Sequence, residues 1–300
     1  MKPFPIPVVA LGPGSQPEED ETLDYMNMPQ GMETYRPPIL PEPEELAERA
    51  GAHRALRAVL QALDVVRHGG AAQRVDLHGL DAEDLALINQ VMGEGEVSAR
   101  VAAPASGEIG CEWRIQESVF AGVWRAMAFE GDALLSDHLE VGRIPAGLMQ
   151  AARDDVVARH APPLPDPLPP GVMNSPMLLT EIEDAWLKWQ AGQPPHVINL
   201  TLLPMDVPDI SFMDHQLGTG RVLVLSRGYG NCRITNTRMP NCWRVVYYNS
   251  QDLVILNTVE VIDLPEVACA ADVDLHDSHE RLGEVLQWVE GVLDPVAAAS

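Results

Sequence analysis

Basic residues are scarce in this chain of 300 residues. Lysine and arginine number 20 against 44 aspartate and glutamate residues, so the formal net charge is −24. Binding to nucleic acid or to an anionic membrane surface needs a basic patch, which this composition disfavours. We therefore expect no nucleic-acid partner, whereas a basic segment of another protein is compatible with the charge.

Cysteines and long apolar runs are also few. Four cysteines in 300 residues do not suggest a disulfide framework. The sequence has no apolar run of about 18 residues, the length that predicts a membrane span. The opening segment MKPFPIPVVALGPG is too short and too rich in proline for a secretory signal. These absences predict a cytoplasmic protein with reduced thiols and no membrane insertion.

Signature motifs of common enzymes are missing too. The sequence contains no Gly-x-Ser-x-Gly, P-loop, HExxH or CxxC pattern. The segment Gly218-Thr219-Gly220 supplies two glycines of a dinucleotide fingerprint, but it follows a predicted helix instead of opening one. We therefore predict that the protein is not an enzyme and has no catalytic residues and no cofactor.

Four strands are predicted between Val222 and Pro265. The strand segments are rich in β-branched and aromatic residues, and turn-forming residues separate them. Because strands joined by short turns pair antiparallel, this stretch predicts a meander with one face packed on helices. The predicted strands are Val222–Leu225, Cys232–Thr237, Cys242–Tyr248 and Leu253–Ile262.

The same element occurs earlier in the chain. A shift of 125 places residues 77–97 on residues 202–222 with six identities in 21 positions. A shift of 119 places residues 114–129 on residues 233–248, and a third block with a shift of 120 begins at Glu140. Three blocks in the same order, with small length changes at turns, indicate a duplicated structural unit. The strands predicted for the first copy are Val75–His78, Ser98–Ala103, Ile109–Ser118, Val123–Glu130 and His138–Ile144.

The predicted fold class is α+β, with two duplicated units that are each an antiparallel meander packed with helices. Residues 1–43 are expected to form a disordered, acidic and proline-rich tail, because they hold few large apolar residues. Residues 44–161 are predicted to form the first repeat, 162–176 a proline-rich linker, and 177–300 the second repeat. A last helix is predicted to begin near Asp277 and is assigned to the second repeat.

Aspartates recur at two predicted helix starts. Asp81 and Asp206 each precede a helix, with Asp84 and Asp209 three residues later. A capping side chain needs only one short acceptor at this spacing, so N-capping is favoured over catalysis for these residues.

A Trp-Arg pair is shared by both copies, at Trp124-Arg125 and Trp243-Arg244. Adjacent residues of a strand face opposite sides, so tryptophan is expected to pack inward. Arginine is then expected on the other side, paired with Glu140 or its counterpart Glu260.

Cys232 and Cys242 lie on neighbouring predicted strands, where they can approach each other as a pair across a hairpin. The first copy has Trp113 and Val123 at these positions, which favours buried structural thiols in the second copy. The alternative is a role as metal or iron–sulfur ligands, for which further ligands are needed.

Two segments resemble the HupH/HyaF family of hydrogenase expression/formation proteins. They are GPGSQPEEDETLDYMNMPQGMETYRPP near the start and SRGYGNCRITNTRMPNCWRVVYYNSQDLVILNTVEVIDLPEVACAADVDLHDSHERLGE near the end. The resemblance implies accessory work in the maturation of a [NiFe] uptake hydrogenase, as a chaperone of the iron–sulfur small-subunit precursor before twin-arginine export. Other hydrogenase maturation proteins are implied as further partners, and no catalytic residues are transferred. The alternative function is the handling of a metal or an iron–sulfur cluster by Cys232 and Cys242.

Differences between the two copies point to a partner-binding site. Asparagines stand at the turns of the second copy where the first copy has Glu112, Gly122 and Glu130. Asparagine and tyrosine side chains suit recognition of a peptide backbone, although asparagine is also a good turn residue. We predict that a partner binds these turns and the methionines of the tail. The predicted site residues are Tyr229, Asn231, Asn241, Asn249, Met26, Met28 and Met32.

Overall fold

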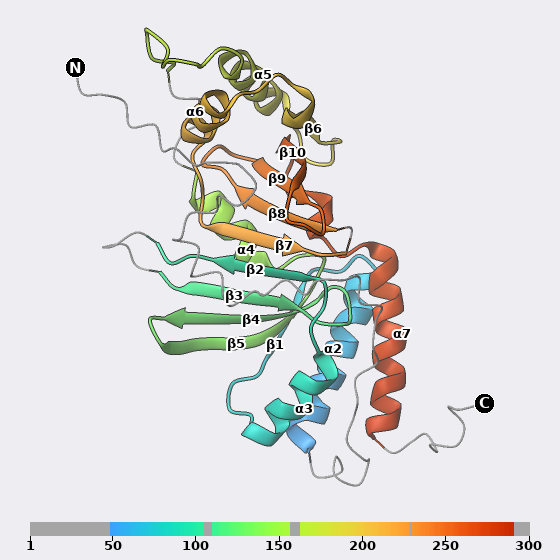
Figure 1. Cartoon of the computed structure of the whole chain (residues 1–300). Helices are drawn as coiled ribbons and strands as arrows, with labels where there is room; N and C mark the ends of the chain where they lie inside the picture. The colour runs from blue at the N-terminus through green and yellow to red at the C-terminus, as the bar shows by residue number, and fades with distance from the viewer. Residues whose placement is uncertain (1–48, 105–109, 157–162, 229, 291–300) are drawn as a thin grey trace. The chain divides into compact units, whose positions relative to one another are not determined.

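The computed structural model describes residues 49–104, 110–156, 163–228 and 230–290 (Figure 1). The predicted tail, with its methionines, and Tyr229 lie outside the described residues. The described chain divides into two compact units. The first unit contains residues 49–149 and 268–290, and the second unit contains residues 150–267. Both units mix helices with antiparallel strands, as the sequence predicts.

The first unit contains a five-stranded antiparallel sheet. Its strands lie in the order β1-β5-β4-β3-β2. The four strands β2, β3, β4 and β5 follow one another along the chain and form the predicted meander, while the earlier strand β1 pairs with β5 at the edge. The bounds are β1 (Gln73–Asp76), β2 (Val97–Val101), β3 (Glu112–Glu117), β4 (Val123–Glu130) and β5 (Ala133–Val141).

The sheet of the second unit repeats this topology. Its strands lie in the order β7-β8-β9-β10-β6, so the short strand that precedes the meander again pairs with the last strand. The register repeats as well, because Trp124 lies opposite Glu140 and Trp243 lies opposite Glu260. The bounds are β6 (His196–Asn199), β7 (Val222–Ser226), β8 (Asn231–Asn236), β9 (Cys242–Tyr248) and β10 (Val254–Val261). The internal repetition inferred from the sequence is thus present in the fold.

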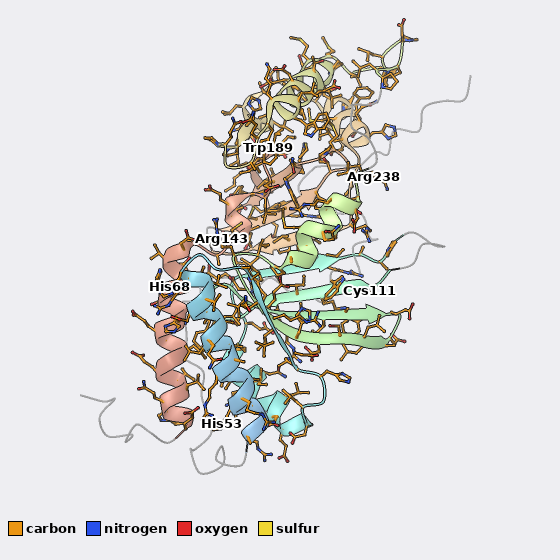
Figure 2. The ribbon with its side chains drawn as sticks, turned by 180° about the vertical axis from the view of Figure 1, so that it is seen from behind. His53, His68, Cys111, Arg143, Trp189 and Arg238 are labelled. Atoms are coloured by element: carbon orange, nitrogen blue, oxygen red, sulfur yellow. The ribbon has the colours of Figure 1, made fainter. Side chains whose placement is uncertain are left out.

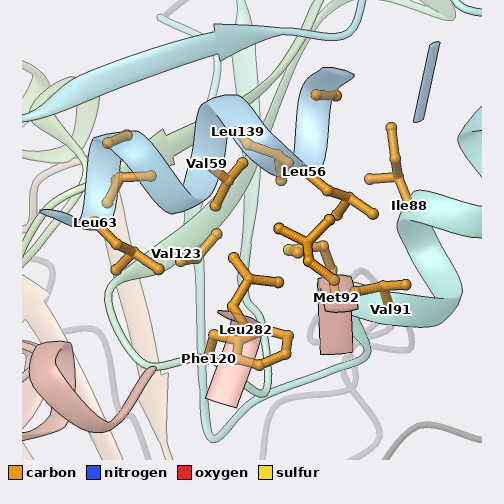
Figure 3. Close-up of a cluster of buried hydrophobic side chains, with 14 of the residues drawn as sticks. Leu56, Val59, Leu63, Ile88, Val91, Met92, Phe120, Val123, Leu139 and Leu282 are labelled. Atoms are coloured by element: carbon orange, nitrogen blue, oxygen red, sulfur yellow. The ribbon is translucent and has the colours of Figure 1, made fainter. Parts of the chain in front are cut away.

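Three helices supply the core of the first unit on one face of its sheet. They are α2 (Ala50–Arg67), α3 (Ala82–Met92) and α7 (Asp272–Val289). Figure 3 shows Leu56, Val59 and Leu63 of α2 directed at side chains of the strands and of the other two helices. Alanine, leucine and valine recur along α2 at intervals of three and four, which places them on one face of the helix.

Helix α7 packs in the first unit, although it follows the second repeat in the sequence and the sequence interpretation assigned it there. Its buried residues Leu275, Leu282 and Leu286 belong to the core of the first unit. The Nε atom of Arg57 in α2 also lies 2.6 Å from Oε1 of Glu290, just beyond α7. The helix starts at Asp272, five residues before the predicted start at Asp277. Amphipathic spacing predicts that one face of a helix is buried, but it does not identify the core that buries it.

The second unit contains helices α5 (Ser175–Lys188) and α6 (Val207–Leu217). Leu179 and Ile182 of α5 pack with Phe212 and Met213 of α6 and with Val259 of β10. A helix α4 (Ala146–Asp154) follows β5, and two short 3-10 helices are η2 (Leu200–Leu202) and η3 (Glu266–Ala268).

The aspartates at the helix starts have structural roles. The second aspartate of each pair accepts hydrogen bonds from the start of another helix, which the sequence did not predict. Asp81 caps α3, because its side chain accepts the N–H groups of Glu83 and Asp84. Asp206 occupies the corresponding N-cap position of α6 without a side-chain capping bond. Asp209 is buried and accepts four hydrogen bonds of 2.9 Å from the start of α5, so it joins α6 to α5.

Candidate partner-binding site

The predicted site asparagines do not form one cluster. Asn231 begins β8 and lies opposite Tyr248, so it shares one end of the second sheet with Asn249. Asn241 precedes β9 and lies at the other end of that sheet, about 20 Å away along the strand. The structure therefore does not bring Asn241 together with Asn231 and Asn249, and its role in binding stays a prediction. Strand direction separates them, and direction depends on pairings that lie outside any local pattern.

Two of the asparagines have turn functions. The side-chain oxygen of Asn249 accepts the backbone N–H groups of Gln251 at 2.8 Å and Leu253 at 3.0 Å, which closes the β9–β10 turn. Asn241 has a φ of 51° and occupies the place of Gly122, which has a φ of 81°. Asparagine tolerates this left-handed conformation better than most residues do. Of the three, Asn231 is the one for which the described residues show neither a turn-closing side-chain bond nor a left-handed backbone.

The surroundings of Asn231 carry hydrogen-bonding groups of several kinds. Asn231 and Arg233 point to the same face of β8, and Tyr248 is the cross-strand neighbour of Asn231. Burial raises the pKa of the Tyr248 phenol, and the nearby Arg233 guanidinium opposes this change. This sheet end therefore presents an amide, a guanidinium and a neutral phenol, which together can donate to and accept from a peptide backbone.

Cys232 and Cys242 do not approach each other as a pair. Cys232 lies opposite Tyr247, and Cys242 lies five residues before Tyr247 at the other end of β9. Five residues span about 16 Å of strand, and an odd separation puts the two side chains on opposite faces of the sheet. A metal site formed by Cys232 and Cys242 together would need the two thiols side by side, and the structure does not place them so.

The two buried thiols are also poor ligands as they stand. Burial raises the pKa of Cys232 to about 12 and that of Cys242 to about 11. Metal ligation requires the thiolate, so these environments disfavour it. All four cysteines are free, and Cys111 lies just before β3 of the first unit (Figure 2). Over the described residues, no group of three or more His, Cys, Asp or Glu side chains is placed to hold a metal ion.

Within each Trp-Arg pair, the tryptophan and the arginine face opposite sides of the sheet, as expected. The arginines, however, pair with other carboxylates than those expected. Trp124 is fully buried and donates from Nε1 to the Gly142 carbonyl at 2.9 Å. Arg125 forms an ion pair with Asp137, whose carboxylate lies 2.7 Å away, and not with Glu140. Glu140 is the cross-strand neighbour of Trp124 and therefore shares its face.

Arg244 of the second unit also departs from the expectation. It lies 3.4 Å from Asp214 of α6 and does not pair with Glu260. Burial lowers the pKa of Arg244 and raises that of Asp214, while the two charges stabilise each other. Arg244 thus connects β9 to helix α6, whereas the ion pair of Arg125 joins the neighbouring strands β4 and β5.

The first unit has a hollow of about 330 Å³ that the sequence interpretation missed. It lies where Trp113 and the buried His138 meet edge to face, with ring centroids 5.8 Å apart. The polar groups in its wall are engaged in the fold: His138 contacts Ser136 Oγ at 3.2 Å, and Glu140 accepts the Ala146 N–H at 2.7 Å. Glu140 thereby anchors the start of α4.

A second missed network fixes the start of β7. Asp155 accepts hydrogen bonds from the side chains of Arg221 at 2.6 Å and Asn236 at 3.0 Å. Burial alone would raise the pKa of Asp155, but hydrogen bonds from Arg221 and Asn236 hold it below its ordinary value. Arg221 and Asn236 lie 66 and 81 positions after Asp155 in the sequence, so no local sequence signal could have indicated these contacts.

The fold and this site define a class of protein: a duplicated α+β chain with hydrogen-bonding side chains at one end of its second sheet. No helix in the described ranges combines the length and the apolar character needed to cross a membrane.

Comparison with known proteins identifies the family. The C-terminal conserved region of the HupH hydrogenase expression protein family matches residues 50–161 and again residues 172–289. The chain belongs to this family, and each repeat corresponds to one copy of the family's conserved region. The boundaries of the two matches agree with the duplication found in the sequence and in the strand order.

Several relatives resemble the chain along nearly its whole length. The hydrogenase expression/formation protein HoxQ of Cupriavidus necator is 56% identical over 97% of this chain and 100% of its own. HupH of Rhodobacter capsulatus is 45% identical over 95% of this chain and 98% of its own. The hydrogenase-1 operon protein HyaF of Escherichia coli is 34% identical over 93% and 95%. A solved HupH from Thiobacillus denitrificans is 26% identical, covers 38% of this chain and 93% of its own, and has a TM-score of 0.34.

Proposed function

We propose that this protein is an accessory factor in hydrogenase maturation that holds the iron–sulfur small-subunit precursor in the cytoplasm before twin-arginine export. Other maturation proteins take part in the same assembly. The observation that carries the proposal is the similarity, along 97% of the chain, to a protein named for hydrogenase expression and formation. Both repeats match the family region, so the duplicated unit itself is the part that the family shares.

The charge of the chain supports a basic target. A net charge of −24 attracts positively charged segments and repels acidic ones. A precursor with a twin-arginine signal offers such a segment, and attraction of this kind increases the rate of encounter more than the final affinity. Salt is therefore expected to weaken capture, mainly through the association rate.

We place the contact at the end of the second sheet that contains Asn231 and Tyr248. The amide, guanidinium and phenol groups there suit hydrogen bonding to a peptide backbone. Tyr229 immediately precedes this end in the sequence, and the tail contributes Met26, Met28 and Met32, whose flexible side chains adapt to varied apolar surfaces.

The test is capture of a tagged small-subunit precursor under anaerobic conditions. Replacement of both Tyr229 and Asn231 by alanine is expected to weaken capture by about tenfold, which corresponds to about 1.4 kcal/mol. The matched control is Glu112→Ala, which changes the position equivalent to Asn231 in the first copy and should leave capture unchanged. A thermal melt verifies that each variant folds. Undiminished capture by the folded double variant would remove the contact from this sheet end and favour the tail around Met26.

A further inference from the structure

The two units share an unusual feature at the tip of one hairpin. In the β4–β5 hairpin, Ala128 pairs with Ser136 while the next residue, Phe129, pairs with Leu134, so Leu135 is an extra residue. In the β9–β10 hairpin, Tyr247 pairs with Leu256 and Tyr248 with Val254, so Ile255 is the extra residue. Both hairpins can be followed in Figure 1. The same β-bulge therefore occurs in both copies, since Leu135 and Ile255 differ by the shift of 120 that relates the repeats.

Each bulge presents a large aliphatic side chain to solvent. Leu135 is 55% exposed and Ile255 is 56% exposed, and the preceding Leu134 and Val254 are 52% and 44% exposed. The extra residue of a bulge interrupts the regular alternation of side chains along the strand, and here both aliphatic residues of each pair lie in solvent. Bulges re-aim side chains and behave as designed features. Equivalent exposed aliphatic residues in both copies are difficult to attribute to accidental surface variation.

The backbone at these tips is also available for pairing. In the described part of the first unit, β1 pairs with β5 only from His138 to Val141, which leaves residues 133–136 without a strand on their outer side. In the second unit, β6 pairs with β10 only from Thr258 to Val261, and the N–H of the next residue, Asn257, donates to Thr201 Oγ1 of η2 at 2.8 Å. Residues 254–256 therefore have no strand on their outer side among the described residues. An exposed apolar strand edge can accept an added strand from another polypeptide.

An acidic residue accompanies each pair of aliphatic residues. Asp132 precedes Leu134 by two positions, and Asp252 precedes Val254 by two positions, so the acid is repeated with the same shift of 120. Both aspartates are exposed. With the net charge of −24, this arrangement favours a partner segment that carries basic residues beside its apolar ones.

We propose that each hairpin tip, residues 132–136 and residues 252–256, binds an extended apolar peptide segment flanked by basic residues, which adds as a strand to the open edge. The chain then has two equivalent binding sites, one in each unit. This inference goes beyond the proposed function, because it concerns a class of peptide and not a particular subunit. A protein with two such sites gains avidity for a partner that carries two segments.

The test uses a fluorescent synthetic peptide with a valine- and leucine-rich centre and lysines at both ends. Fluorescence anisotropy titration of the full chain is expected to give two bound peptides per chain. Leu135→Lys and Ile255→Lys are each expected to remove one of them, because lysine at an edge strand opposes both strand addition and the basic flanks. The double variant should bind at least about tenfold more weakly. A peptide with glutamates in place of the lysines should also bind about tenfold more weakly at low salt.

Leu187→Lys is the matched control, because Leu187 is 61% exposed and belongs to helix α5, which is part of neither hairpin. It should bind two peptides as the unmodified chain does. Circular dichroism verifies that each variant folds. If the lysine variants do not fold, the double variant Leu135→Thr/Ile255→Thr is used in their place, because threonine is favourable in strands. Two peptides bound to the folded double variant would overturn the proposal. Dimerisation of the chain through these tips, seen by sedimentation and unaffected by the peptide, would also overturn it by making a second copy the occupant.

Discussion

Replacement of Asp209 by alanine is expected to destabilise the second unit more than any other single change at a helix start. One oxygen of Asp209, a residue that is 1% exposed, accepts the N–H groups of Met173, Asn174 and Ser175 and the hydroxyl of Ser175. These donors lie at the start of α5, where the helix itself provides no acceptors. Alanine would leave them without this partner and would remove the hydrogen bonds that join α6 to the start of α5.

The expected loss is about 3 kcal/mol. A helix cap contributes about 0.5–2 kcal/mol, and a hydrogen bond to a charged group contributes about 1.5–3 kcal/mol. The four bonds share one oxygen, so their contributions are not additive, and the estimate is far below their sum. The comparison variant is Asp84→Ala in the first unit, where the carboxylate accepts the Ala52 N–H at 3.0 Å. A single such bond predicts a smaller loss, of about 1–2 kcal/mol.

Urea denaturation measures the loss, and hydrogen exchange of the α5 amides locates it. The effect also depends on pH. Burial alone would raise the pKa of Asp209, but the N–H groups of Ser175 and Met173 hold it below its ordinary value. The stabilisation is therefore complete above the pKa of an unfolded aspartate, about 3.9, and is lost as the pH falls through the lower folded value. A loss below about 1 kcal/mol at pH 7, with unchanged exchange in α5, would refute this reasoning.

Two further substitutions and one labelling experiment test other parts of the structure. Burial raises the pKa of Glu117 to about 7, so the folded state holds a proton more tightly than the unfolded state and stability falls as the pH rises from about 4.3 to 7. Glu117→Gln should flatten that decline in urea titrations, and an unchanged pH profile would contradict the assignment. Gly51→Ala should lower the melting temperature despite the better helix propensity of alanine, because the new methyl group would overlap the Asp84 carboxylate. Cys232 and Cys242 should resist maleimide labelling in the folded protein at pH 7, as followed by mass spectrometry, and rapid labelling of either would contradict their burial.

Much of the fold could be predicted from the sequence because strands and turns leave local signals. The β9 segment Cys242–Tyr248 and the β4 segment Val123–Glu130 were predicted to the residue. β-branched and aromatic residues between turn formers fix such boundaries. The duplication was visible in the sequence because equivalent positions keep the same residue where the fold needs it. Trp124 and Trp243, for example, are both buried, and each donates its indole N–H to a backbone carbonyl.

The errors arose where the answer depends on contacts between distant segments. Helix α7 has a clear apolar face, yet that face matches either core, and the structure buries it in the first unit. The faces of Cys232 and Cys242 follow from the β8–β9 register, which turn composition alone does not determine. The exposed bulges at Leu135 and Ile255 were missed for the same reason, since a bulge is a property of a strand pair and not of one strand.

The central claim is that the protein binds the hydrogenase small-subunit precursor. Anaerobic size-exclusion chromatography of the purified chain mixed with that precursor tests it most directly, with the hydrogenase large subunit as the control. We expect the precursor to elute together with the chain at micromolar concentrations and the large subunit to elute separately. Separate elution of the folded chain and the precursor under these conditions would contradict the account.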